Sequence, residues 1–120
     1  MKVLFIGHNA QPAGAQLLLL HYLQWLSVNR KEIEINVLLM KPGPLEEEYR
    51  KTGNLYLFPS YNNTRNPLLE IYYSFRQKKF IRFLVSQEYD VIYSNTILNA
   101  SILEKLAVSG APIITHVHEM

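Results

Sequence analysis

The sequence predicts a doubly wound α/β fold, with a parallel sheet of about five strands in the order 3-2-1-4-5 and helices on both faces. Five short apolar runs, several rich in Val and Ile, are each bounded by Gly, Pro or Asn. Segments with helical spacing separate these runs, so strand and helix alternate along the chain. Right-handed crossovers then bury the strands on both faces, which explains why the runs are continuously apolar. The expected architecture is a single Rossmann-like domain over residues 1–120.

The expected strands cover residues 2–7, 34–40, 54–58, 91–94 and 112–117. After the first strand, apolar residues at i, i+3, i+4 and i+7 predict a helix with one core-facing stripe, which comprises Ala15, Leu18, Leu19, Tyr22, Leu23 and Leu26. A Pro-Gly-Pro turn and three glutamates follow the second strand and predict a short helix that ends at Gly53. A loop rich in Pro, Asn and Ser leads to a long helix over about 68–87.

Composition excludes several functional classes. A net charge of +2 is too small for a general nucleic-acid binder. The absence of cysteine excludes disulfides and thiolate zinc sites, and no apolar run approaches the ~20 residues that cross a bilayer. The start of the chain lacks the pattern of a secretory signal, so we expect a cytoplasmic protein.

The predicted topology places a ligand crevice between the first and fourth strands. In an open parallel sheet, ligands bind beyond the carboxyl ends of the strands where the strand order reverses. The loop at residues 8–14 and the segment SNTILNA meet there, and Asn95 or Thr96 can cap the next helix. The end of the fifth strand, THVHEM, lies beside them.

Known cofactor motifs do not fit this crevice. Gly7 and Gly14 are seven residues apart, which departs from the G-x-G-x-x-G spacing of a dinucleotide site, and no Gly-Lys-Ser or Gly-Lys-Thr of a phosphate-binding loop occurs. His116, His118 and Glu119 could hold a metal, but strand-end histidines commonly line polar crevices without one. We expect neither a cofactor nor a metal.

Three segments, in this order and at these separations, resemble the N-terminal domain of GT-B-fold glycosyltransferases of the family 4 type. They are KVLFIGHNAQPAGAQLLLLHYLQWL, with a turn similar to the family's Gly-Gly-Ala-Glu, then YDVIYSNT, and finally GAPIITHVHEM. The likeness spans essentially the whole chain. It implies that His118 contacts the transferring sugar or holds the reacting geometry. It also implies a set of cleft-lining residues, namely Ala13, Gly14, Ala15, Asn95, Thr96 and Glu119.

One departure from the family lies in the first loop, where Ala13 replaces a glycine. Because a Cβ penalises positive φ, this change puts a close backbone approach at Ala13 in question. The sequence also contains no counterpart of the family's C-terminal half, which holds the nucleotide-sugar pocket. The chain is therefore expected to supply the acceptor side and to be inactive alone.

The resemblance implies a retaining transferase that moves a sugar from a nucleotide-sugar donor to a glycan or lipid-linked acceptor, in polysaccharide biosynthesis. In such a reaction the protein orients the acceptor and the leaving diphosphate, and it needs no protein nucleophile. The missing half leaves a second hypothesis open. The chain could instead be a non-catalytic, flavodoxin-like module that docks a partner protein through the same crevice.

The long helix raises a further possibility. On a helical wheel, Leu69, Tyr73, Phe80, Phe83 and Leu84 share the expected core face. Ile71 and Phe75 lie opposite, with Lys78 and Arg82. Apolar groups among cations are typical of a helix in peripheral contact with a membrane, and also of a solvated flank with snorkelling cations.

Overall fold

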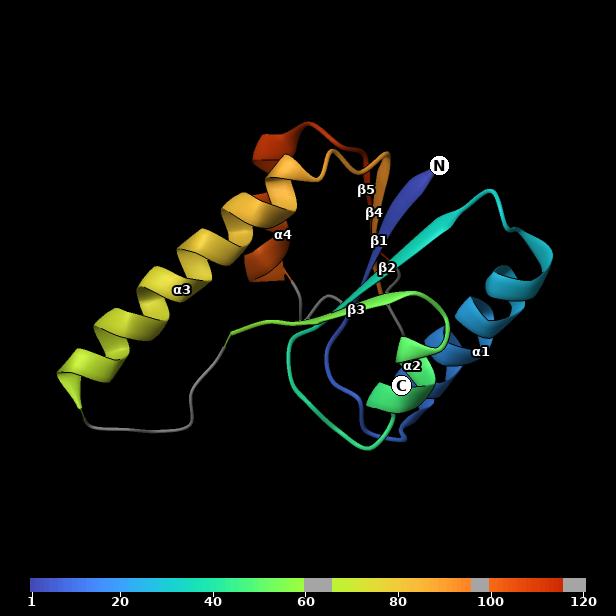
Figure 1. Cartoon of the computed structure of the whole chain (residues 1–120), viewed down its shortest axis with the longest axis horizontal. Helices are drawn as coiled ribbons and strands as arrows, with labels where there is room; N and C mark the ends of the chain where they lie inside the picture. Colours follow the sequence, from blue (N-terminus) through green and yellow to red (C-terminus); the bar gives the residue numbers. More distant parts are fainter. Residues whose placement is uncertain (60–65, 96–99, 116–120) are drawn as a thin grey trace.

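The predicted sheet and its strand order are confirmed. The computed structural model describes residues 1–59, 66–95 and 100–115, and its five strands form one sheet in the order β3-β2-β1-β4-β5 (Figure 1). All four strand pairs are parallel. The strands are β1 (Lys2–Gly7), β2 (Glu34–Leu39), β3 (Asn54–Leu57), β4 (Val91–Ser94) and β5 (Ile113–Thr115).

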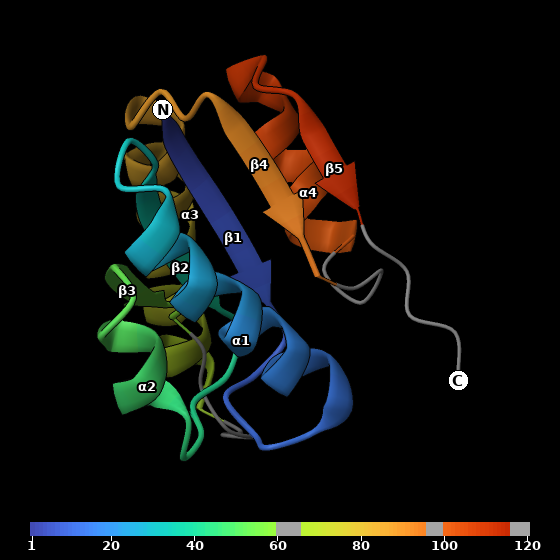
Figure 2. The same cartoon turned by 90° about the vertical axis from the view of Figure 1, so that its right-hand side faces the viewer.

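Helices cover both faces of the sheet, as predicted for a doubly wound fold. On one face lie α1 (Gly14–Asn29) and α2 (Glu46–Arg50), and on the other lie α3 (Pro67–Ser86) and α4 (Ala100–Leu106), which a short 3-10 turn, η2 (Ala107–Ser109), extends (Figures 1 and 2). Each face has its own hydrophobic cluster. Leu19, Leu23 and Val37 belong to the α1 side, whereas Leu4, Leu84 and Ile92 belong to the α3 side.

Helix α1 buries a narrower stripe than its spacing predicts. Leu19, Leu23 and Leu26 are buried with Leu20, but Leu18 is 54% and Tyr22 is 48% exposed. The reason is the position of the helix: α1 lies over β1, and no helix in the described ranges lies over β5 on that face (Figure 2). The helix flank that faces β4 and β5 consequently stays accessible.

Helix α3 begins with a clear local signal and then extends beyond the sheet. The Asn66 side chain accepts a hydrogen bond from the backbone N–H of Leu68 at 3.0 Å, and Pro67 occupies the first helical position. Leu84 is buried near the end of the helix, but Leu69 is exposed, so its predicted core position is wrong. The first turns of α3 project away from the sheet (Figure 1), and none of the five described strands lies beneath them.

Candidate functional site

Asn95, at the end of β4, binds the elements on both sides of the first predicted loop. The Asn95 side-chain amide donates a hydrogen bond to the carbonyl oxygen of Ala15 at 2.9 Å, and the Asn95 backbone N–H donates to Ile6 at 2.9 Å. Asn95 is only 2% exposed. It therefore connects the end of β4 to the first turn of α1, across the point where the strand order reverses. The predicted capping of the next helix by Asn95 or Thr96 involves residues 96–99, which lie outside the described residues, so it stays a prediction.

The loop between β1 and α1 is held by its own hydrogen bonds. The Asn9 carboxamide oxygen accepts from the backbone N–H of Gln11 at 3.0 Å and from the Gln16 side chain at 2.8 Å. Ala10 is fully buried, and its carbonyl accepts from the N–H of Leu45 at 2.8 Å. These bonds close the loop against the turn that precedes α2.

Gly43 allows this close approach of two backbones. A Cβ at Gly43 would lie 2.5 Å from the carbonyl carbon and 2.6 Å from the carbonyl oxygen of Ala10. The Gly43 backbone N–H donates to the Glu46 carboxylate at 3.0 Å, so this glutamate supports the turn, as its first-turn position in α2 suggests. The Pro-Gly-Pro turn thus serves as a platform for the loop after β1.

Tyr49, from α2, contacts the first turn of α1. Its ring is completely buried, and its hydroxyl donates to the carbonyl oxygen of Gln16 at 2.5 Å. Burial raises the pKa of Tyr49 to about 12. Two successive carbonyls in the first turn of α1 therefore accept side-chain hydrogen bonds. Asn95, after β4, binds the carbonyl of Ala15, and Tyr49, in α2, binds that of Gln16.

The predicted residues at the start of α1 occupy an open edge of the molecule. Ala13 precedes the helix with φ −118° and ψ 167°, which is ordinary extended backbone, so the anticipated strain from its Cβ does not arise. A Cβ at Gly14 would meet no atom within 4 Å. The first backbone N–H groups of an α-helix have no intrahelical partner, and they carry the positive end of its dipole. This end of α1 can therefore approach an anionic group.

Three of the predicted site residues, Thr96, His118 and Glu119, lie outside the described residues, as does His116. Their predicted roles stay predictions. The described part of the crevice consists of the loop after β1, the first turn of α1 and Asn95.

A small cavity beside the crevice involves residues that the sequence analysis missed. It has a volume of about 250 Å³ and lies between α1 and the end of β4, lined by Leu18, Leu19, Tyr22, Tyr93 and Asn95. Burial, and secondarily the neighbouring Tyr22, raises the pKa of Tyr93. Tyr93 lies two residues before the predicted site residue Asn95 and on the α1 side of β4, because side chains alternate along a strand. This alternation is the sequence signal that could have placed Tyr93 beside α1.

The chemistry of the described site is that of recognition. The amides of Asn9, Gln16 and Asn95 are engaged in hydrogen bonds within the protein, and the helix terminus adds backbone donors. Tyrosine rings at Tyr22 and Tyr93 provide flat apolar surface with polar tips. Such a surface can contact a hydroxyl-rich or phosphorylated group.

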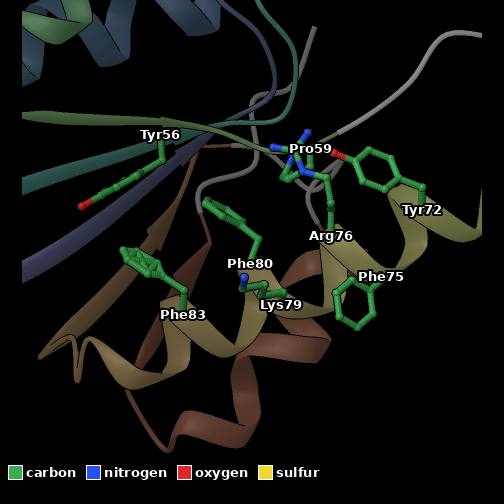
Figure 3. Close-up of a pocket in the computed structure, with 8 residues that line it drawn as sticks. All are labelled: Tyr56, Pro59, Tyr72, Phe75, Arg76, Lys79, Phe80 and Phe83. Carbon is green, nitrogen blue, oxygen red and sulfur yellow. The ribbon is translucent and has the colours of Figure 1, made fainter. Parts of the chain in front are cut away.

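A second hollow lies away from this crevice, between β3 and α3. It has a volume of about 670 Å³, and its lining is mainly aromatic, with two cations (Figure 3). The lining residues are Tyr56, Pro59, Tyr72, Phe75, Arg76, Lys79, Phe80 and Phe83. The four residues predicted to contact a membrane, Ile71, Phe75, Lys78 and Arg82, are all exposed on α3, and Phe75 also lines this hollow.

Two features of the described residues concern metal binding and membrane insertion. Within residues 1–59, 66–95 and 100–115, no three His, Asp or Glu side chains are grouped as metal ligands. None of the helices described in the structure combines the length and apolarity required to span a bilayer.

The fold belongs to the Rossmann-like α/β class, and solved structures share it along nearly the entire chain. HepE from Anabaena, determined in complex with UDP and glucose, matches 99% of this chain with a TM-score of 0.68 and 21% identity. The match covers 30% of the HepE chain, so this chain spans less than a third of that protein.

A domain of similar size from another protein class has the same fold. The C-terminal domain of the PF1911 hydrogenase from Pyrococcus furiosus matches 97% of this chain and 90% of its own, with a TM-score of 0.64 and 18% identity. No protein-family model and no curated protein sequence matches the chain significantly. At these identities the likenesses establish the fold, and the function has to be argued from the site.

Proposed function

We propose that this chain is the acceptor-side domain of a retaining GT-B glycosyltransferase of the family 4 type. In this proposal it works with a donor-binding domain that supplies the nucleotide-sugar pocket, and the sugar passes to a glycan or lipid-linked acceptor. The observation that carries the proposal is the hydrogen bond from Asn95 to Ala15, which joins the β4 end to α1 at the topological switch point. Nucleotide-binding proteins of this class use that point for their ligands.

The comparison with HepE supports this direction. HepE binds UDP and glucose, and its fold matches 99% of this chain. The three motifs that resemble the family also fall at the crevice or at strands leading into it: β1 with α1, β4 with Asn95, and β5. The match covers 30% of HepE, which agrees with a chain that supplies one wall of a two-domain cleft.

In the proposed mechanism, this domain orients the acceptor and receives the departing diphosphate near the start of α1. The N-terminal amides of α1 stabilise negative charge as it develops on the leaving group. Asn95 and Tyr49 hold the carbonyls of Ala15 and Gln16, so the amides of that turn are oriented before the ligand arrives. His118 contacts the transferring sugar in this proposal.

Titration of the ¹⁵N-labelled chain with UDP-glucose, followed by NMR, tests the site. The amides of Gly14, Ala15 and Asn95 should shift, with a dissociation constant of about millimolar, roughly 4 kcal/mol, because one wall buries little of the ligand. Asn95→Ala should reduce these shifts, whereas Asn29→Ala, an exposed amide at the far end of α1, should leave them unchanged. Micromolar binding, or shifts confined to other surfaces, would contradict the proposed position of the site.

Turnover in the two-domain enzyme tests the roles of His118 and Gly14. His118→Ala and Gly14→Val should each lower kcat by about 100-fold or more. The valine has space in this domain, where a Cβ meets no atom within 4 Å, so its effect should come from blocking the closed cleft. His21→Ala, an exposed histidine on α1, is the matched control and should retain wild-type rates.

The likeness to the PF1911 hydrogenase domain favours a second candidate function. Because the match covers 90% of that domain, the same fold exists as a compact module in a protein of another class. The chain would then dock a partner protein through its crevice without catalysis. In that case UDP-glucose should shift none of the amides at the start of α1, which separates the two candidates in the same titration.

A further inference from the structure

Four large apolar side chains are exposed along one side of the first turns of α3. Leu68 is 76%, Ile71 66%, Tyr72 52% and Phe75 66% exposed. At 100° per residue, these side chains lie within a single stripe opposite the buried Leu84. Isolated exposed apolar residues are common on protein surfaces, but four of them within two turns form a contiguous patch, which marks a contact surface.

The same stripe continues into basic residues in the later turns of α3. Lys78, Lys79 and Arg82 are exposed and lie on the same side of the helix as Phe75. The full helix carries four basic residues and one acidic residue, Glu70. Lys78, Lys79 and Arg82 form no ion pair with any described residue. The basic residues that form ion pairs within the described ranges are Arg30, Arg50 and Lys51, and all three lie outside α3.

We propose that this stripe binds the surface of an anionic lipid bilayer. The first turns of α3 would place Leu68, Ile71 and Phe75 at the acyl boundary, while Lys78, Lys79 and Arg82 contact lipid phosphates. Tyr72 fits the same arrangement, because tyrosine prefers the headgroup level and its ring lies 5.8 Å from the Arg76 guanidinium carbon. The cytoplasmic leaflet carries the anionic lipids that such a surface requires.

The composition of the stripe favours a membrane over a protein partner. The cores of protein interfaces are depleted in lysine, whereas this stripe places two lysines and an arginine directly beside its apolar residues. The projecting part of α3 is also readily accessible, because it extends away from the sheet (Figure 1). The inference does not depend on the proposed catalytic role, since it concerns a different surface.

Co-sedimentation of the full chain with lipid vesicles tests the proposal. The chain should bind vesicles that contain phosphatidylglycerol and should bind weakly to pure phosphatidylcholine vesicles. The double variant Lys78→Glu/Arg82→Glu should weaken binding to the anionic vesicles by at least about 30-fold. Raising the salt concentration should weaken wild-type binding as well, because salt screens charges at the surface.

Two further variants test whether binding depends on this surface or only on the net charge and apolarity of the protein. Lys31→Glu/Lys41→Glu changes the net charge by the same amount at exposed positions outside α3, and it should reduce binding much less than the α3 pair. Ile71→Ser/Phe75→Ser should also weaken binding while the thermal stability is unchanged, because both side chains are exposed. Equal losses in the two charge variants, or no wild-type binding to anionic vesicles, would overturn the proposal and leave an acidic protein as the partner to seek.

Tryptophan fluorescence can locate the contact. The only tryptophan, Trp25, lies on α1 and is 52% exposed, so its emission should not change when anionic vesicles are added. In the variant Trp25→Phe/Phe75→Trp, the emission should shift to the blue as the new indole enters the interface. A shift of Trp25 in the wild type without a shift in this variant would place the membrane contact on α1 and contradict the proposal.

Discussion

The loop after β1 and the first turns of α3 are both attached to the sheet, but they are held in opposite ways. In the loop, Ala10 is fully buried and its carbonyl accepts a bond from Leu45 in a distant turn. In α3, the first turns depend on local features, namely the Asn66 cap and Pro67. Their apolar side chains contribute little to the core, because Leu68 and Ile71 are mostly exposed.

This difference separates a loop that contacts within the chain hold in place from helix turns whose apolar side chains are largely exposed. The loop and the first turn of α1 are held by hydrogen bonds within the chain, since Asn95, Tyr49 and Asn9 each bind the backbone or side chains of this region. The exposed turns of α3 gain their burial only when something covers them. Substitutions in the first region should therefore change global stability, and substitutions in the second should change binding or local order.

Gly43→Ala should produce the largest effect. The new Cβ would lie 2.5 Å from the Ala10 backbone, so one of the two segments must move, at a cost of about 2–4 kcal/mol in the free energy of unfolding. Urea denaturation measures this loss. Gly14→Ala is the matched control, because its Cβ meets no atom within 4 Å, and it should change stability by about 0.5 kcal/mol or less. Similar losses in both variants would show that the loop is not clamped.

Tyr49→Phe should change how stability depends on pH. Burial raises the pKa of Tyr49 to about 12 in the folded chain, whereas the unfolded value is 10.0. The stabilisation is complete below pH 10 and is lost as the pH rises towards 12, because the unfolded chain releases the proton first. The free energy of unfolding, measured with urea, should therefore fall between neutral pH and about pH 11 in the wild type. This fall should be smaller by about 1 kcal/mol in the phenylalanine variant. Parallel pH profiles would contradict the assigned burial of the hydroxyl.

Asn66→Ala should have the smallest global effect. Removing the cap frees the N–H of Leu68, so hydrogen exchange in the first turn of α3 should accelerate by about fivefold. Global stability should change by less than about 0.5 kcal/mol, because few side chains in these turns reach the core. Asn66→Asp keeps the accepting oxygen and should preserve slow exchange. A large drop in global stability would show that the first turns of α3 are part of the cooperative core.

Sequence patterns predicted the elements well, since the five strands and the main helices lie within a few residues of their expected bounds. The same reasoning brought the loop at residues 8–14 and Asn95 to one crevice, because parallel topology places both at carboxyl ends. It did not predict the contacts that organise the crevice. Asn95 binds a residue 80 positions away, and Tyr49 binds one 33 positions away. No local pattern encodes such pairings.

The amino-acid sequence by itself determined the order of strands and helices, the parallel arrangement and the edge of the sheet that Asn95 and the loop after β1 share. These follow from periodicity, turn residues and the rules for crossovers, which act over short distances or on whole elements. Only the tertiary structure decided which apolar residues are buried: Leu18 and Tyr22 remain accessible on α1, as does Leu69 on α3. The physical reason is that periodicity defines an apolar face, whereas burial requires another element to lie against it.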